Sequence, residues 1–75
     1  MKQSQLNFKE NTKDCVWCTF DGLFEFYWEP RYDRICVTDM RNANALCSDI
    51  FISTDLKAAA VRKEICDYLK GVFNV

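Results

Sequence analysis

The chain has no histidine, and its 75 residues include only one proline and two glycines. Histidine is the side chain that most often transfers protons near neutral pH, so Ser-His-Asp and Cys-His catalytic arrangements are excluded. Two isolated glycines do not form a glycine-rich phosphate loop. The scarcity of glycine and proline leaves no flexible linker, which predicts one domain over residues 1–75. We therefore expect neither an enzyme nor a resident cofactor.

Long apolar runs are also missing. No stretch approaches the roughly 20 apolar residues that a membrane helix needs, and residues 1–10 lack the apolar run of a signal peptide. The cysteines number five, an odd count, so at least one of them has no partner within the chain. We expect reduced thiols in the cytoplasm rather than a disulfide scaffold, and no membrane partner.

Charge is distributed unevenly, although the formal net charge is only −1. Residues 1–13 and 56–75 each carry a net charge of +2, whereas residues 14–55 carry −5. The acidic segment coincides with the predicted strands. An acidic sheet repels phosphate, which argues against direct nucleic-acid binding and favours a basic protein as partner.

Aromatic residues are abundant, and they concentrate between Cys15 and Pro30, where both tryptophans and three of the six phenylalanines lie. Asp21-Gly22 is a strong hairpin signal. A two-residue turn pairs Phe20 with Leu23 and sorts the side chains onto two faces. The face predicted to form the core carries Cys15, Trp17, Thr19, Phe24, Phe26 and Trp28. The second face carries Val16, Cys18, Phe20, Leu23, Glu25 and Tyr27.

The remaining strands are predicted by alternation of apolar and polar residues. Residues 4–9 are expected to form an edge strand, and residues 10–14 a loop. Residues 34–39 alternate with β-branched side chains and predict a further strand, and residues 45–52 predict the last one.

A C-terminal helix is predicted from Leu56 to Lys70 because apolar residues recur at steps of three and four. Residues 53–55 supply three consecutive N-cap types, and Gly71 is expected just after the helix end. The predicted fold class is therefore α+β: an antiparallel meander of four to five strands, with this amphipathic helix packed on one face.

The cysteines offer an alternative chemistry. Cys15 and Cys18 have the C-x-x-C spacing, and with Cys36 and Cys47 they would supply four thiolates for zinc. However, residues three apart on a strand point to opposite faces, and the second pair is widely spaced. A small zinc-binding or thiol-redox protein that uses Cys15 and Cys18 remains the alternative hypothesis.

The second face of the hairpin is too apolar for solvent, so either the chain's own ends or a partner must cover it. An apolar patch with acidic rim residues is typical of a protein interface. The predicted binding residues are Phe20, Leu23, Glu25, Tyr27, Glu29, Asp49 and Phe51. The expected partner is another protein, a basic nucleic-acid-handling protein in particular, or a second copy that forms a homodimer.

In size, acidity and lack of catalytic residues the chain resembles small inhibitors made by phages and mobile elements, anti-CRISPR proteins among them. The resemblance is one of composition, and no motif carries it. It implies a non-enzymatic inhibitor or adaptor that acts by binding another protein.

Overall fold

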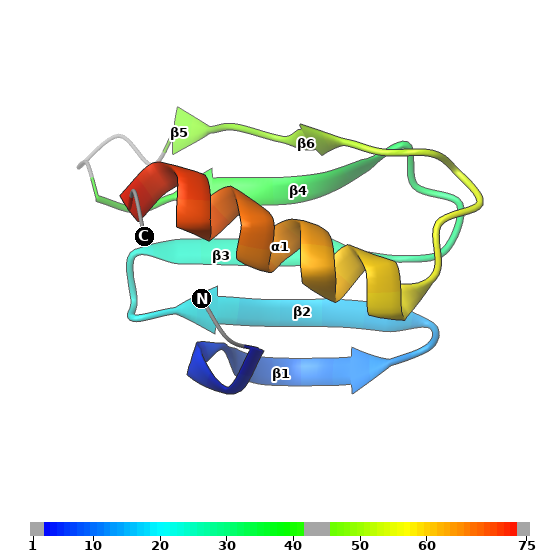
Figure 1. The fold of residues 1–75 in the computed structure, drawn as a ribbon, viewed down its shortest axis with the longest axis horizontal. Coiled ribbons are helices and arrows are strands. Elements are labelled where there is room, and N and C mark those ends of the chain that lie inside the picture. Colours follow the sequence, from blue (N-terminus) through cyan, green and yellow to red (C-terminus); the bar gives the residue numbers. More distant parts are fainter. Residues whose placement is uncertain (1–2, 42–45, 74–75) are drawn as a thin grey trace.

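The protein is described here by a computed structural model, which covers residues 3–41 and 46–73. Figure 1 shows an antiparallel sheet with one helix lying across it. The first five strands follow one another in chain order, and the sixth also pairs with the fourth. The strands are β1 (Asn7–Thr12), β2 (Cys15–Phe20), β3 (Phe24–Trp28), β4 (Arg34–Asp39), β5 (Leu46–Cys47) and β6 (Ile50–Phe51). The 3-10 helix η1 (Gln3–Gln5) precedes them and the helix α1 (Ala58–Phe73) follows, so the predicted α+β meander is confirmed.

The turn between β2 and β3 forms where it was predicted, but the register that it sets is different. Asp21 and Gly22 both have positive φ, 52° and 69°, as a type I′ turn requires, and the Leu23 N–H donates to the Phe20 carbonyl at 2.8 Å. Phe20 then pairs with Phe24 rather than with Leu23. Leu23 is therefore an extra residue opposite β2, a bulge, and its carbonyl accepts from the Met40 N–H at 2.8 Å instead.

A one-residue change of register moves half of the hairpin to the other face of the sheet. Phe24, Phe26 and Trp28 do face the helix as predicted, and each is at most 1% exposed. Their partners on β2 are the buried Val16 and Cys18, and not Trp17, which is only half-buried on the opposite face. The predicted core face was therefore correct for β3 and wrong for β2.

The strands at the two edges of the sheet differ in length and position from the predicted strands. The N-terminal strand was expected over residues 4–9, whereas β1 runs from Asn7 to Thr12 and its pairing is bulged between Phe8 and Glu10. The expected last strand is broken into the two-residue strands β5 and β6. Ala45, the predicted first residue of that strand, lies outside the described residues. The strand predicted from Arg34 to Asp39 is confirmed with the same bounds.

The helix packs on the sheet through the apolar stripe that the sequence predicts. Its buried residues are Ala58, Val61, Ile65, Cys66 and Leu69. The ring of Tyr68 lies edge-on to Phe24 and Phe26, with centroid distances of 6.0 and 5.9 Å. The helix starts two residues later than predicted and continues through Gly71, so Gly71 does not terminate it. No helix in residues 3–41 and 46–73 is long and apolar enough to cross a membrane.

One carboxylate points into the helix-facing side of the sheet. Asp39 is 8% exposed, and its two oxygens accept hydrogen bonds from the Arg41 guanidinium at 2.7–3.2 Å and from the Arg41 backbone N–H at 3.0 Å. The guanidinium also lies 4.9 Å from the centroid of the Phe24 ring. The hydrogen bonds from Arg41 lower the pKa of Asp39.

The register predicts that two neighbouring aromatic residues contribute differently to stability, because Phe26 is buried in the core and Tyr27 lies on the opposite face of the sheet. Phe26→Leu leaves a cavity in the core and should lower the free energy of unfolding by about 1–2 kcal/mol. Tyr27→Leu, the matched change on the other face, should lower it by less, because no core cavity is created. Urea unfolding followed by tryptophan fluorescence measures both. An equal or larger loss for Tyr27→Leu would contradict the register.

The Asp39–Arg41 contact predicts a pH-dependent contribution to stability. Because the folded-state pKa of Asp39 lies below its unfolded value, the contribution is full above about pH 4 and is lost as the pH falls through the folded-state value. Asp39→Asn should therefore lower the thermal midpoint at neutral pH, and the gap to wild type should narrow on acidification. Asp21→Asn, in the exposed turn, is the control. A gap that stays constant with pH would contradict the assignment.

Candidate functional site on the open sheet face

The sheet has one face under α1 and one face that no described helix or strand covers, as Figure 1 shows. We call the second one the open face. Alternation along the strands places outward-pointing side chains on it. They include Glu10, Trp17, Thr19, Glu25, Tyr27, Arg34, Cys36, Thr38, Cys47 and Phe51.

Aromatic rings form a row at the centre of the open face. Trp17 and Tyr27 are direct cross-strand partners, with ring centroids 5.9 Å apart in an edge-to-face arrangement, and Tyr32 lies 6.3 Å from Tyr27. The Trp17 Nε1–H donates to Glu25 Oε2 at 3.0 Å, and Lys9 Nζ lies 3.4 Å from the same oxygen and 4.8 Å from the Trp17 ring centroid. These contacts orient the rings, and all three aromatic residues are half-buried.

Negative charge gathers beside this row. The Tyr27 hydroxyl donates to Glu29, and this hydrogen bond raises the pKa of Tyr27 well above its ordinary value. Burial, followed by the charge of Glu29, raises the pKa of Tyr32. Burial, followed by the charge of Glu10, raises the pKa of the Cys15 thiol. The charges of Glu10 and Glu29 therefore add to the effects of burial and hydrogen bonding that raise the pKa of these three neighbouring acids.

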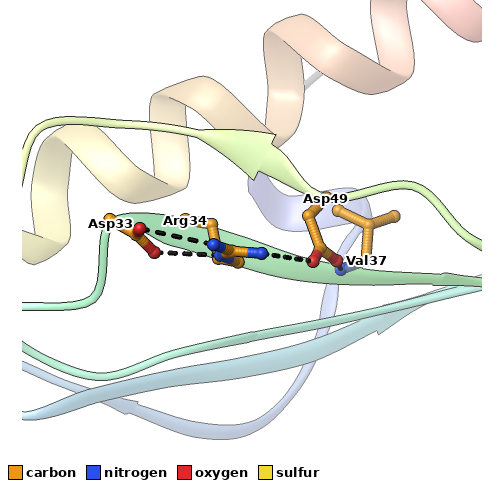
Figure 2. Close-up of polar contacts among 4 residues, drawn as sticks. All are labelled: Asp33, Arg34, Val37 and Asp49. Carbon is orange, nitrogen blue, oxygen red and sulfur yellow. Dashed lines mark hydrogen bonds and ion pairs between the residues drawn. The ribbon is translucent and has the colours of Figure 1, made fainter.

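Arg34 organises the other side of the open face, where β4 meets the short strands (Figure 2). Its guanidinium lies between Asp33, at 2.9 Å, and Asp49, at 3.7 Å, and 5.0 Å from the centroid of the exposed Phe51 ring. Asp49 Oδ1 also accepts a hydrogen bond from the Val37 backbone N–H at 3.1 Å. The side chain of Asp49 thus replaces a strand residue as the acceptor between β5 and β6.

The structure brings together five of the seven predicted binding residues. Glu25 and Tyr27 lie at the centre of the open face, with Glu29, Asp49 and Phe51 at its margin. The other two lie elsewhere. Phe20 points to the helix side, where its ring is 5.5 Å from that of Phe73, and Leu23 is half-buried against the core. The chain's own C-terminal helix thus covers Phe20, and the binding role of the other five stays a prediction.

Several residues of the open face were not predicted from the sequence. Trp17 was assigned to the core because of the assumed register, and Tyr32 was not among the predicted binding residues. Lys9, Glu10 and Arg34 were treated as parts of a charge count rather than as neighbours of the aromatic row. The signal for Trp17 was present, because Val16, Cys18 and Phe20 form a fully apolar alternate set that belongs with Phe24, Phe26 and Trp28.

The cysteines are dispersed rather than gathered. Cys18 is fully buried on the helix side of β2, whereas Cys15 lies on the other side near Glu10 and Tyr27. Burial, with a smaller effect of the nearby Cys66, raises the pKa of the Cys18 thiol to about 12. Among residues 3–41 and 46–73, no three Cys, Asp or Glu side chains are placed to hold a metal ion together. This geometry does not support the C-x-x-C pair as a joint redox or zinc site.

The open face offers contact surface of two kinds. Its aromatic rings supply apolar contact area, and its carboxylates are held by hydrogen bonds and ion pairs. Comparison of the chain with protein-family models, curated proteins and solved structures finds no match. The function of the open face is therefore inferred from its own geometry.

The burial of the thiols predicts their order of reaction with iodoacetamide. Cys47 is exposed and should be alkylated first, Cys36 more slowly, and Cys18 only when the chain unfolds. Peptide mass mapping over a time course measures the order, with urea-unfolded protein as the reference for full reactivity. Alkylation of Cys18 at the rate of Cys47 in the folded protein would contradict the assigned faces of β2.

Proposed function

We propose that the protein is a non-enzymatic protein-binding module whose open face binds a basic surface of another protein. The observation that carries the proposal is the composition of this face. Among the described residues, a row of aromatic rings is surrounded by five carboxylates, whereas three cations, Lys9, Arg31 and Arg34, lie on or beside this face. The carboxylates are Glu10, Glu25, Glu29, Asp33 and Asp49. An acidic aromatic face complements a positive patch and repels an acidic one.

The strongest place for a partner's cation is the side of the face near Tyr27. Glu25, Asp33 and Asp49 already have a cation beside them, whereas no described cation pairs with Glu10 or Glu29. A lysine or arginine of the partner would meet two uncompensated carboxylates there. It would also lie over the rings of Tyr27 and Tyr32, where cation–π attraction adds to the charge interaction.

A hollow adjoins the open face. It has a volume of about 610 Å³ and is lined by Arg31, Tyr32, Asp33, Arg34, Cys36 and Thr54. Interfaces are typically anchored by a few side chains that fill such hollows, while the rim excludes water. We infer that one partner side chain fills this hollow beside the seated cation.

The partner class follows from the charge. Proteins that handle nucleic acid present basic surfaces to phosphate, and an acidic aromatic face competes for the same surface. The proposal therefore extends to an inhibitor or adaptor of such a protein, in the manner of the phage inhibitors that the chain resembles in composition. The cytoplasm is the proposed compartment, because all five cysteines are free thiols.

The test compares the wild type with the triple variant Glu25→Lys, Tyr27→Ala, Glu29→Lys. A protein captured by the purified chain is itself purified, and its affinity for both forms is measured by calorimetry. Loss of two carboxylates and the central ring should weaken binding by about a hundredfold or more. The wild-type affinity should also fall as salt is added, because partly exposed charges are screened.

The matched control exchanges an exposed ion pair on the helix, Lys63→Glu with Asp67→Lys, whose side chains lie 3.1 Å apart. This variant keeps the net charge and should bind like the wild type. Thermal unfolding checks that both variants fold. Unchanged affinity in the triple variant would show that the open face is not the interface. Sedimentation showing a wild-type dimer that the triple variant lacks would identify a second copy as the occupant and overturn the basic partner.

A further inference from the structure

A second surface lies at the end of the molecule where α1 begins. Figure 1 shows that the β1–β2 turn, the β3–β4 loop and the N-terminus of α1 come together there. Two adjoining hollows of about 470 and 560 Å³ share Lys13, Lys57 and Ala58 in their linings. The contact between the elements is direct, since Arg62 Nη1 donates to Asn11 Oδ1 at 2.9 Å.

No side chain in residues 3–41 and 46–73 caps the helix N-terminus in these hollows. Residues 53–55 were predicted to cap it, but α1 starts only at Ala58, and the Ser53 hydroxyl donates to Asp55 instead. The N–H groups of Ala58, Ala59 and Ala60 have no acceptor among the described residues, and the first helix residue whose N–H finds one is Val61, which donates to the Lys57 carbonyl at 3.0 Å. Three free donors at the positive end of a 16-residue helix favour an anion.

The cations around this end are unpaired. Lys13, Arg31, Lys57 and Arg62 line the two hollows. None of them forms an ion pair with a described carboxylate, whereas Lys9, Arg34, Arg41 and Lys63 each do. Two carboxylates, Asp14 and Asp55, also line the hollow of about 470 Å³ and reduce its positive charge. The four cations and two carboxylates that line the hollows have a net charge of +2, and the positive end of the helix dipole adds to it.

Trp28 supplies an independent observation. Its side chain is 1% exposed and lines the same hollow as Lys57 and Ala58. Its Nε1–H is the one buried side-chain polar atom in the described part of the chain that lacks a hydrogen-bond partner. Buried donors are almost always satisfied in proteins, so an unpaired donor on a side chain that lines a cationic hollow favours the binding of an acceptor there.

We propose that this end of the protein binds a compact phosphate-type anion. The helix N–H groups and the side chains of Lys13 and Lys57 would hold its oxygens, and Trp28 Nε1 would donate to it from the floor of the hollow. A long polyanion is disfavoured because the adjoining sheet is acidic, so the positive region is only as large as the two hollows. The site lies apart from the centre of the open face, and its existence does not depend on the proposed protein binding.

The test is a titration of the full chain with pyrophosphate, at constant ionic strength, followed by ¹H–¹⁵N NMR. Saturable shifts are expected for the N–H groups of Ala58–Ala60 and for Trp28 Nε1–H. Lys57→Gln and Lys13→Gln should each weaken binding by up to about tenfold, because each removes a charged hydrogen-bond donor. Lys70→Gln makes the same charge change in the last turn of α1 and should leave the affinity unchanged.

Trp28→Phe removes the N–H donor together with part of the buried indole ring, and it should weaken binding while the spectrum stays dispersed. Arg31→Gly provides a second variant if the core does not accept phenylalanine at position 28. Arg31 has a φ of 75°, a conformation that glycine adopts without strain, so this variant should fold and bind more weakly. Shifts that grow linearly without saturation, or an equal loss in Lys70→Gln and Lys57→Gln, would overturn the proposal. Binding of a single-stranded oligonucleotide without binding of pyrophosphate would overturn it as well.

Discussion

The bulge at Leu23 is the constraint on which the arrangement of this protein depends. The Asp21-Gly22 turn reverses the chain, but the extra residue after it decides which side of β2 faces inward. With the bulge, Val16, Cys18 and Phe20 join Phe24, Phe26 and Trp28 under the helix, and the buried layer becomes wholly apolar on both strands. Without it, Trp17 would be buried and the small protein would lose part of that layer to solvent.

The molecule presents two unlike surfaces. The open face carries aromatic rings and an excess of carboxylates, whereas the end that holds the start of α1 carries unpaired cations. The end of β1 and the start of α1, which belong to the two segments that are basic in the sequence, meet at that end (Figure 1). Charges of opposite sign are thus separated over a molecule whose longest extent is 32 Å.

Local sequence patterns predicted the strands and the helix. Contacts between residues far apart in the sequence determined the features that these patterns did not predict. The meander, the strand from Arg34 to Asp39 and the apolar stripe of the helix follow from periodicity, which the sequence expresses directly. The face of Trp17 depended on one unpaired residue in a turn, which no dipeptide preference encodes. The helix start at Ala58 was missed because three good capping residues precede it, yet they form their own turn. The charged neighbours of the aromatic row come from different strands, so no spacing could reveal them.

The edges of the sheet have a consequence for how the protein behaves at high concentration. Strands with free backbone groups at an edge are templates for aggregation. Here β1 is bulged and carries Lys9 and Glu10. The opposite edge consists of two-residue strands separated by Ser48 and Asp49, and the Asp49 carboxylate accepts a hydrogen bond from the Val37 N–H. Neither edge offers a long flat row of free donors and acceptors. Pairing of two copies edge to edge is thereby disfavoured in a chain that is small and rich in aromatic residues.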